Sequence, residues 1–375
     1  MKTKIYLIIL ALFSWCTAFA QIFEVDGINY FITAPDKVRV HVKTGCYSGD
    51  IVIPESVEYS DDNYAVTAIG VNAFKGCLSL NSVALPSSIE EIQSQAFLEA
   101  ENLTAVNFPS SISNIGNYAF MRCYALETID LSATSVTTLG DYAFTRCESA
   151  TSIVLPNTMT SIGDFNFYYC GSLTQIDIPN TATSLGIRAF SYSGLTSIDI
   201  PDSVTTIGLS AFEVCADLET INVPNSITSI GDNVFYGNYS LTSFNIGVSV
   251  PLIINSNVFA GTPINNAILN VPAGSESNYA TAPVWQNFGT INGTLSTNEQ
   301  NIANSVMIYP NPSSEFLSIR GIKEQEFYVI YNLEGKMVSK GIISNNLKVN
   351  IQRLKNGVYF LKLNDYDAIK FIKGI

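Results

Sequence analysis

The chain has 375 residues, enough for two or three domains, and only 14% of them are charged while 47% are hydrophobic. Residues 21–304 hold 26 Asp/Glu against 7 Lys/Arg, a balance of −19, whereas residues 305–375 hold 6 against 10, a balance of +4. The change of sign indicates two modules with different roles, and the acidic module argues against nucleic-acid binding, which needs a basic surface. The one histidine, His41, leaves almost no room for Ser/His or Cys/His catalysis or a His-rich zinc site.

The first 20 residues have the pattern of a secretory signal peptide. Lys2 and Lys4 precede the apolar run Ile5–Phe13, and small residues at Ala18 and Ala20 predict cleavage before Gln21. The run is too short to remain as a membrane-spanning helix, so we expect no transmembrane segment after cleavage. The alternative, a lipoprotein signal that uses Cys16, is disfavoured because Trp15 stands where a small residue is needed.

Residues 21–65 are interpreted as an N-terminal cap for the repeats that follow. Tyr30–Thr33 and Val38–Val42 alternate like short strands, and Asp50–Pro54 is similar to the last part of a repeat. Stacked repeats need atypical terminal units to close the exposed end of their core.

Near-copies of one phrase, Ile-Gly-x-x-Ala-Phe-x-x-Cys-x-x-Leu-x-x-Ile-x-Leu-Pro, recur at steps of 22 to 24 residues and define a repeat array over residues 66–291. A unit of this length cannot bury its own apolar face, so the copies must stack. The recurring aromatic predicts a ladder of rings along the core. It falls at Phe74, Phe97, Phe120, Phe144, Phe167, Phe190, Phe212 and Phe235, with a degenerate ninth copy at Phe259.

Each repeat is expected to contribute two short strands. The Leu-x-x-Ile-x-Leu-Pro part, as at Leu173–Pro179, predicts a strand that pairs in parallel with its neighbours in a continuous sheet. Thr160–Ile162 and its counterparts predict a second, shorter strand. The Ala-Phe-x-x-Cys part between them has helical spacing but room for only a turn or two. The predicted fold class is therefore an α/β repeat solenoid.

Five cysteines of the mature chain share one repeat position: Cys77, Cys123, Cys147, Cys170 and Cys215. Other copies have Ala, Ser or Asn there, which indicates a small buried slot. Disulfides between consecutive turns are the alternative in an exported protein. We favour reduced cysteines, because side chains that run parallel into a core are poorly oriented for bridging.

The repeat phrase resembles the BspA-like leucine-rich repeats of bacterial surface proteins over about residues 42–290, including the ending Val271–Trp285. The resemblance implies a curved, right-handed solenoid that acts in adhesion and protein binding rather than catalysis. It does not supply a ligand.

Residues 292–304 are polar and lack the repeat period, as is typical of a linker. In residues 305–375, alternating runs around Leu317–Ile319, Phe327–Tyr331, Leu347–Ile351 and Tyr359–Leu363 are separated by turn signals. Short strands at this spacing predict a small β-sandwich.

This C-terminal module resembles the sorting domain of cargo for the Bacteroidetes type IX secretion system. The matching residues are Tyr309, Pro310, Asn311, Pro312, Gly335, Gly357, Tyr359 and Lys370. The resemblance implies contact with the type IX secretion machinery, removal of the module, and a secreted or outer-membrane cell-surface location. The alternative is a small β domain that caps the array or binds a partner.

Two surfaces of the array could carry function. On the outer face of the main sheet, Asp177 and Asp199 should stack on adjacent strands, where a bound cation could relieve their repulsion. We favour a solvated polar face, because no known calcium loop is present.

The second surface collects aromatic residues and arginines at matched positions of four consecutive repeats, which is typical of binding hot spots. The candidate ligand-binding residues are Tyr118, Arg122, Tyr142, Arg146, Phe165, Tyr169, Arg188 and Tyr192. Lateral stacking that protects the loops is the alternative explanation for these residues.

Neither a phosphate-binding loop nor a nucleophile elbow is present in the sequence, and we predict no catalytic residues, cofactor or metal. The expected function is a secreted surface protein for adhesion or protein recognition, whose partner is an extracellular protein or glycan. Carbohydrate binding and a purely structural role in the cell envelope are the alternatives.

Overall fold

The computed structural model describes residues 21–295 and, further along, residues 307–309, 315–320, 325–333, 335–343, 348–363 and 369–374. The chain divides into two compact units, Met1–Leu295 and Ser296–Ile375, which are considered separately. The predicted signal peptide lies outside the described residues, as do residues 296–304 of the predicted linker.

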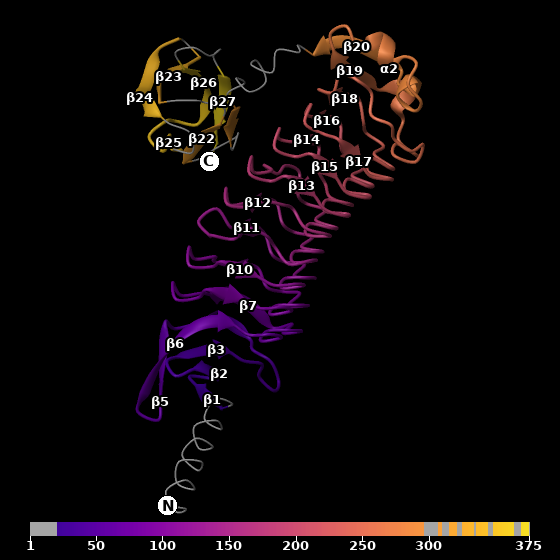
Figure 1. Cartoon of the computed structure of the whole chain (residues 1–375). Coiled ribbons are helices and arrows are strands. Elements are labelled where there is room, and N and C mark those ends of the chain that lie inside the picture. The colour runs from indigo at the N-terminus through magenta and orange to yellow at the C-terminus, as the bar shows by residue number, and fades with distance from the viewer. Residues whose placement is uncertain are drawn as a thin grey trace, which may run out of the picture. The chain divides into compact units, whose positions relative to one another are not determined.

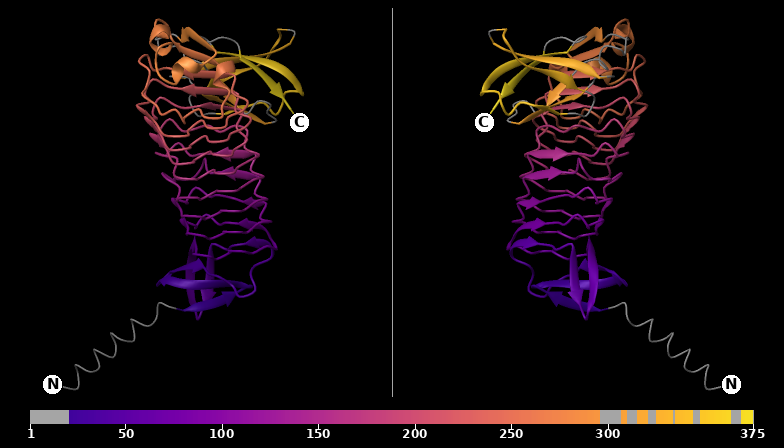
Figure 2. Two further views of the ribbon diagram at one scale, coloured as in Figure 1. Left: turned by 90° about the vertical axis from the view of Figure 1, so that its right-hand side faces the viewer. Right: turned by 90° about the vertical axis from the view of Figure 1, so that its left-hand side faces the viewer.

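The first unit is a coil of stacked turns, so the predicted repeat solenoid with parallel sheets is confirmed (Figures 1 and 2). Most repeats contribute one strand to the main sheet, which is interrupted rather than continuous. Its three sections are β4 (Gly49–Val52), β7 (Leu80–Ala84) and β9 (Ala105–Val106); β11 (Thr128–Asp130) and β12 (Ser152–Val154); and β14 (Ser197–Asp199), β16 (Thr220–Val223), β18 (Ser243–Ile246), β19 (Ile268–Pro272) and β20 (Thr290–Leu295). Leu173–Pro179 forms no strand; single bonds between turns, such as Thr196 N–H to the Thr174 carbonyl (3.1 Å), replace the ladder there.

The second strand of each repeat is only two residues long in most turns. These strands are β8 (Glu91–Ile92), β10 (Asn114–Ile115), β13 (Ser184–Leu185), β15 (Thr206–Ile207) and β17 (Ser229–Ile230). Isolated bridges from Ile115 to Leu139 and from Ile162 to Leu185 continue the same row of pairings.

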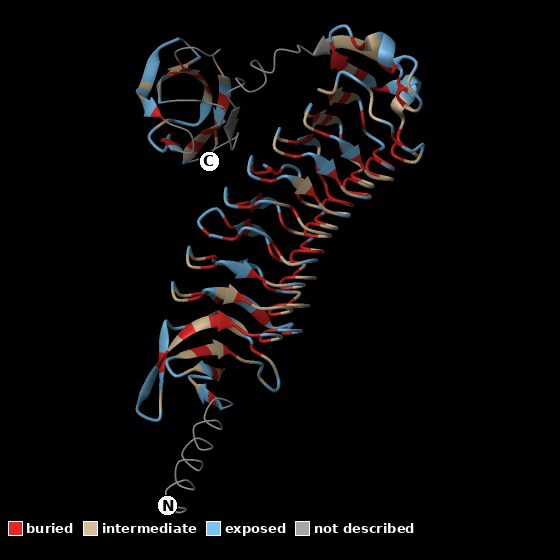
Figure 3. Ribbon diagram, in the orientation of Figure 1, coloured by how far each residue is buried: buried red, intermediate tan, exposed pale blue. Residues whose placement is uncertain are grey.

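The phenylalanine ladder is confirmed as the centre of the core. From Phe74 to Phe259, successive rings are near parallel, with centroids 4.8 to 6.2 Å apart. Buried residues recur in every turn of the coil around this ladder (Figure 3).

The glycine of the repeat phrase lets adjacent turns approach closely. A Cβ added at Gly140 would lie 2.4 Å from the backbone nitrogen of Asn117 and 2.4 Å from the carbonyl carbon of Gly116. Both obstacles are backbone of the preceding turn and cannot rotate away. Gly171, in a neighbouring loop, would meet nothing within 4 Å.

We therefore expect Gly140→Ala to lower the free energy of unfolding by about 1–3 kcal/mol through overpacking. Urea denaturation followed by circular dichroism measures the change. Gly171→Ala is the matched control and should be nearly neutral; equal effects of the two substitutions would contradict the close-approach explanation.

The N-terminal cap is a small sheet that continues into the solenoid. It contains β1 (Ile22–Val25), β2 (Ile28–Ala34), β3 (Lys37–Val40), β5 (Ser56–Tyr59) and β6 (Asp62–Ile69). β3 pairs in parallel with β6, and β6 pairs in parallel with β8, so the cap provides the first rung of the second row of strands. β4, which includes part of Asp50–Pro54, pairs in parallel with β7, as expected for the end of a repeat.

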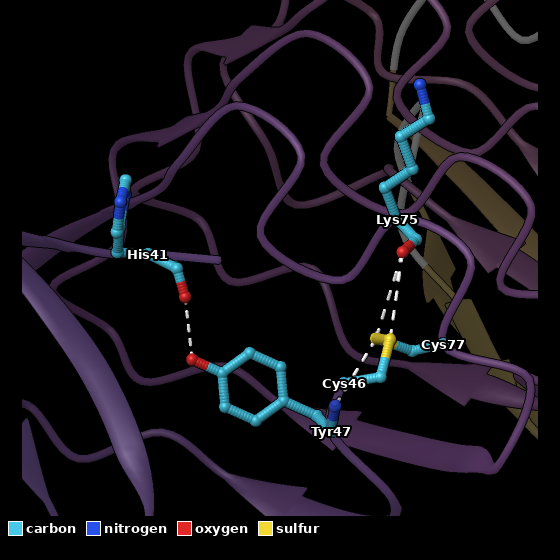
Figure 4. The surroundings of a disulfide bond; sticks show 5 residues. All are labelled: His41, Cys46, Tyr47, Lys75 and Cys77. Atoms are coloured by element: carbon cyan, nitrogen blue, oxygen red, sulfur yellow. Dashed lines mark hydrogen bonds between the residues drawn. A yellow bond between two sulfur atoms is a disulfide. The ribbon is translucent and has the colours of Figure 1, made fainter. Parts of the chain in front are cut away.

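A disulfide links Cys46 of the cap to Cys77 of the first repeat, with sulfurs 2.05 Å apart (Figure 4). The prediction that the repeat-position cysteines are all reduced is therefore wrong for Cys77. The bond places Tyr47 against the end of the phenylalanine ladder, where its ring centroid lies 4.8 Å from that of Phe74. The Tyr47 hydroxyl donates to the His41 carbonyl at 2.6 Å, so both ends of the side chain are fixed.

The other four repeat-position cysteines, Cys123, Cys147, Cys170 and Cys215, are free and buried. Each thiol donates to the carbonyl of the ladder phenylalanine one turn earlier, at 3.2 to 3.5 Å. Burial raises the pKa of the Cys170 thiol to about 12 and that of Cys215 to about 11. Cys77 is bonded to Cys46 instead. It belongs to the first repeat, which no ladder phenylalanine precedes.

The other end of the core is closed by a cap that contains the few short helices of the described residues. These are η1 (Ile264–Asn266), α2 (Glu276–Tyr279) and η2 (Trp285–Asn287). Trp285 and Tyr279 are fully buried; the indole N–H donates to the Leu252 carbonyl at 2.8 Å and the phenol to the Val248 carbonyl at 2.6 Å.

The second unit contains two antiparallel sheets that share one core, in agreement with the predicted β-sandwich. One sheet contains β21 (Met307–Tyr309), β22 (Phe316–Arg320) and β25 (Lys348–Asn350). The other contains, in spatial order, β24 (Met337–Ile343), β23 (Glu326–Asn332), β26 (Gly357–Leu363) and β27 (Ile369–Lys373). Within the described parts of both units, no helix has the length and apolarity needed to cross a membrane.

Candidate functional site

All eight candidate ligand-binding residues have a left-handed backbone conformation, with φ between 52° and 63°. They occupy two positions per repeat, two residues before and two residues after the ladder phenylalanine. In four of the remaining repeats the same two positions are Asn72 and Gly76, Gln95 and Glu99, Ser210 and Val214, and Asn233 and Gly237, also at positive φ. The degenerate ninth copy has Asn257 and Gly261 there, and of these two Gly261 is at positive φ.

This backbone replaces the helical turn expected from the sequence. A right-handed helix cannot include left-handed residues, and the segment instead forms consecutive tight turns. Its amides donate to the next repeat: Tyr118 N–H to the Asp141 carbonyl (2.9 Å), and Arg122 N–H to the Thr145 carbonyl (2.8 Å). The turns are thus joined by a third row of backbone hydrogen bonds along the solenoid.

The left-handed conformation is unfavourable for large side chains, by about 1–2 kcal/mol per residue relative to the right-handed region. Glycine avoids this penalty, and three repeats have it at the second position, as Gly76, Gly237 and Gly261. Four consecutive repeats instead keep Tyr, Phe or Arg at both positions. Strained backbone of this kind is a recognised sign of a functional constraint.

Four of the eight residues form a first column. The Tyr118 and Tyr142 rings stack with centroids 4.9 Å apart, and the Tyr142 and Phe165 rings with centroids 4.3 Å apart. The Arg188 guanidinium lies 5.9 Å from the centroid of the Phe165 ring and pairs with Glu213 at 3.3 Å.

The other four residues form a second column. Arg122 pairs with Glu99 at 2.6 Å, while the Arg146 guanidinium lies 4.5 Å from the centroid of the Tyr169 ring. The Tyr169 ring stacks on Tyr192 with centroids 4.4 Å apart. All eight side chains are half-buried.

Tyr168 joins the two columns, and the sequence patterns did not identify it. Its ring meets Phe165 of the first column edge-on at 5.5 Å, and Tyr169 and Tyr192 of the second at 4.7 and 5.9 Å. Its position in the repeat is occupied by Thr145 and Ser191 in the adjacent turns, so no repeated pattern marks it.

The stacking within the two columns determines which parts of the aromatic rings a ligand could contact. Tyr142 has a ring against each of its faces, and Tyr169 has the Arg146 guanidinium and the Tyr192 ring as neighbours. Burial is the largest cause that raises the pKa of Tyr142 and of Tyr192, so both hydroxyls remain protonated donors at neutral pH. The surface therefore presents ring edges, phenol hydroxyls and paired arginines.

On the outer face of the main sheet, an amide ladder replaces the expected pair of stacked carboxylates. Asn222 donates to the Asp199 carboxylate, Asn245 donates to Asn222 at 2.5 Å, and Asn270 donates to Asn245 at 2.6 Å. Asp177 lies in the turn without a strand, so the prediction that it pairs with Asp199 on adjacent strands is wrong. Within the described residues, no three His, Cys, Asp or Glu side chains are grouped to hold a metal ion.

The sorting-motif residues that the structure describes lie in the second unit. Gly335, with φ 76°, lies in the turn between β23 and β24, and Gly357 begins β26. Tyr359 stacks on Phe371 with centroids 5.6 Å apart and donates to the Lys355 carbonyl at 2.8 Å, while Lys370 lies on β27. Tyr309 ends β21, and Pro310, Asn311 and Pro312 lie outside the described residues.

Comparison with protein-family models gives two matches. Residues 67–171 and 160–279 match the BspA type leucine rich repeat region, in six copies. Residues 307–375 match the secretion system C-terminal sorting domain. A comparison with curated protein sequences gives no match.

Among solved structures, a leucine-rich cell surface protein of Faecalibacterium prausnitzii is similar over 75% of this chain and 97% of its own, with 23% identity and a TM-score of 0.50. A leucine-rich repeat protein of Bacteroides ovatus matches over 69% of this chain and 80% of its own, with 26% identity and a TM-score of 0.37. The similarity to the Faecalibacterium prausnitzii protein supports the solenoid fold.

Proposed function

Because the chain belongs to the BspA-type leucine-rich repeat family and carries a secretion-system sorting domain, we propose that its solenoid recognises proteins outside the cell. The sorting domain directs the protein through type IX secretion to the cell surface or the medium. Leucine-rich repeat proteins are typically binding or structural proteins, and the two family models that match the chain describe a repeat region and a sorting domain. The proposed activity is adhesion by the paired columns, without a cofactor or catalytic step.

The observation that carries the proposal is the concentration of eight large side chains at strained backbone positions in four adjacent turns. Other turns fill these positions with Gly, Asn, Ser, Gln, Glu or Val, and the solenoid continues through them. The coil itself therefore does not require Tyr, Phe or Arg there. Tyr and Arg are the residues that most often dominate protein-protein binding energy.

The covered ring faces favour a protein ligand over a glycan. A sugar ring binds an aromatic side chain by lying on its open face, whereas neighbouring rings occupy both faces of Tyr142. Ring edges, phenol hydroxyls and guanidinium groups suit the mixed apolar and polar side chains of a protein surface. Carbohydrate binding at Tyr118, Tyr142 and Phe165 is therefore the less favoured alternative.

A structural role in the cell envelope is the second alternative, and one specific observation favours it. Each column is stabilised by contacts within the protein, including the Arg122–Glu99 and Arg188–Glu213 ion pairs. If the columns only reinforce the turns, their removal should lower stability without changing the affinity for any partner.

The test compares binding and stability in the same variant. We expect the mature full chain with Tyr118, Tyr142, Arg122 and Arg146 all replaced by alanine to lose at least about tenfold in affinity for an extracellular protein captured by the wild type. Affinity is measured by surface plasmon resonance, and the free energy of unfolding by urea denaturation. A glycan array run in parallel detects the carbohydrate alternative.

The matched control is Ser210→Ala with Val214→Ala, which changes the same two backbone positions in a repeat outside the columns. It should leave both affinity and stability nearly unchanged. Equal binding by the four-residue variant and the wild type would rule out the columns as the binding surface.

A further inference from the structure

The two columns of the candidate site have opposite orders of residue types along the solenoid. From the turn of Phe120 to the turn of Phe190, the order is Tyr, Tyr, Phe, Arg in the first column. In the second column it is Arg, Arg, Tyr, Tyr. Within each column, every arginine therefore has an aromatic residue at the position that is equally far from the other end.

This order makes the face complementary to a second copy of itself. A two-fold axis that crosses the solenoid between the turns of Phe144 and Phe167 places each column opposite the same column of the second copy, in the reverse direction. Every arginine of the columns then faces an aromatic ring of the other copy, and no arginine faces an arginine, a contact that would be strongly unfavourable. The facing pairs are Tyr118 with Arg188, Tyr142 with Phe165, Arg122 with Tyr192, and Arg146 with Tyr169.

The row of side chains between the columns has complementary sizes under the same symmetry. It consists of Met121, Thr145, Tyr168 and Ser191, one from each turn. Tyr168 is partly exposed and contacts both columns, whereas Thr145 is 2% exposed and Ser191 is fully buried. The two-fold axis places Tyr168 opposite Thr145 and Met121 opposite Ser191, so each large side chain faces a recessed one.

The row beyond the second column has the same property. Tyr124 and Glu148 would face Gly194 and Gly171 of the second copy. Gly171 is exposed, and a Cβ added to it would meet nothing within 4 Å. A parallel pair, in which each turn faces the same turn, would instead place Tyr168 against Tyr168. The sizes of the side chains therefore favour the antiparallel arrangement.

The row beyond the first column contains the one unfavourable contact of the arrangement. Asp141 would face Asp164 of the second copy. Both carboxylates lie at the edge of the face, and Asp164 accepts a hydrogen bond from the Ile187 N–H at 2.7 Å. Salt at about 0.15 M screens the repulsion between such exposed charges, so dimer formation is measured at that concentration.

We infer that the two columns bind a second copy of this chain in a symmetric, antiparallel pair. The inference rests on the proposed function, because it names the protein that the columns recognise. The two columns, the row between them and the row on either side give five positions in each of four turns, which is 20 residues per copy. A stable interface between proteins involves about 20–30 residues per side, so the face is large enough for a dimer.

The principal test is the mature full chain with Tyr118→Arg, studied by sedimentation velocity. We expect the wild type to dimerise, and the substitution to raise the dissociation constant of the dimer at least about tenfold, because arginines then face each other at two symmetric contacts. Arg188 shows that this backbone position accepts arginine. Asn233→Arg is the matched control, since it adds the same charge at the same repeat position outside the columns. It should leave the dissociation constant unchanged.

An exchange of residue types within the first column tests the orientation. Tyr118→Arg combined with Arg188→Tyr again places an aromatic residue opposite each arginine of an antiparallel pair. The double variant should return to within about threefold of the wild-type dissociation constant, which also shows that the single variant is folded. In a parallel pair the arginine introduced at position 118 would face Arg122, and the double variant would stay impaired. Failure of the exchange to restore the dimer would overturn the inference.

Photo-crosslinking locates the contact in the dimer. A benzoylphenylalanine that replaces Tyr118 in the mature full chain should crosslink to the turn of Phe190 in a second copy. A crosslink to the turn of Phe120 would indicate a parallel pair, and a crosslink to residues outside the columns would indicate a different interface. Either result would contradict the antiparallel arrangement.

The variant with alanine at Tyr118, Tyr142, Arg122 and Arg146 separates this inference from the proposed function. If the wild type stays monomeric up to about 0.1 mM while this variant loses affinity for a different extracellular protein, the columns bind proteins but not a second copy. If the variant dimerises as well as the wild type, the dimer forms elsewhere and the inference is wrong. If it also binds the captured protein equally well, the proposed function fails with it.

Discussion

Replacement of Phe144 by alanine is expected to lower the free energy of unfolding by about 3–5 kcal/mol, the range for a large side chain deleted from a packed core. Phe144 is fully buried near the middle of the ladder, between Phe120 at 5.1 Å and Phe167 at 6.2 Å. Its loss removes the apolar contact and leaves a cavity that rigid neighbouring turns cannot fill. Because each turn is stabilised mainly by its neighbours, the substitution also weakens the coupling between the two halves of the array.

Urea denaturation followed by far-ultraviolet circular dichroism measures the loss, and hydrogen exchange shows where it occurs. We expect the amides of the turns around Phe144 to exchange faster than those near either cap. Phe144→Leu is the control, because it keeps most of the apolar volume and should be much less destabilising. A loss below about 1 kcal/mol for the alanine variant would mean that the ladder is not the main source of stability.

Removal of the Cys46–Cys77 disulfide is expected to lower the free energy of unfolding by about 3–4 kcal/mol, from the loop-closure entropy of a crosslink across this separation. The two cysteines are 31 residues apart, and the loop they close includes β4, β5 and β6. The effect should be local, because the bond holds Tyr47 against Phe74 at the open end of the ladder. Without it, the cap should separate from the first repeat before the rest of the coil unfolds.

Hydrogen exchange of residues 21–84 in Cys46→Ser, compared with the wild type in oxidising and reducing buffer, measures this separation. Reduction of the wild type should reproduce the variant, and the variant should not respond to reductant. Cys170→Ala is the control, because Ala100 occupies the same repeat position and no disulfide is lost. An unchanged exchange rate in the reduced wild type would show that noncovalent contacts alone hold the cap.

The solenoid could be predicted from the sequence because its core is periodic. Phe97 and Phe120 mark the same place in successive copies, and identical copies can bury their apolar faces only by stacking. The strands β2 and β3 of the cap were also visible, since their apolar residues alternate. These features depend on local pattern and on repetition, which a single sequence contains.

The backbone of the candidate site could not be predicted in the same way. The spacing between Ala119, Phe120 and Cys123 is also the spacing of a helix face, and neither Tyr118 nor Arg122 favours a left-handed conformation. The one available signal was glycine at the position of Arg122 in other copies, at Gly76, Gly237 and Gly261. The residues of the columns were identified correctly as neighbours in matched positions, whereas their role as a binding surface remains a prediction.

The disulfide depended on three-dimensional geometry that the sequence does not contain. Cys46 lies outside the repeats, in a loop whose path is determined by the pairing of β4 with β7. The repeat pattern gave no reason to distinguish Cys77 from Cys123. The position of Cys77 in the first turn separates them, since no ladder phenylalanine precedes that turn.

The hydrogen bonds that join consecutive turns through the left-handed residues also determine how the protein carries a mechanical load. These bonds run from one turn to the next along the coil. When the two ends of the solenoid are pulled apart, the hydrogen bonds between the outermost turn and its neighbour therefore break first, and the next turn follows. Each turn of about 23 residues that peels away releases roughly 75 Å of extended chain. Pulled from both ends, such a coil would lengthen turn by turn, while the Cys46–Cys77 bond would keep its first turn closed.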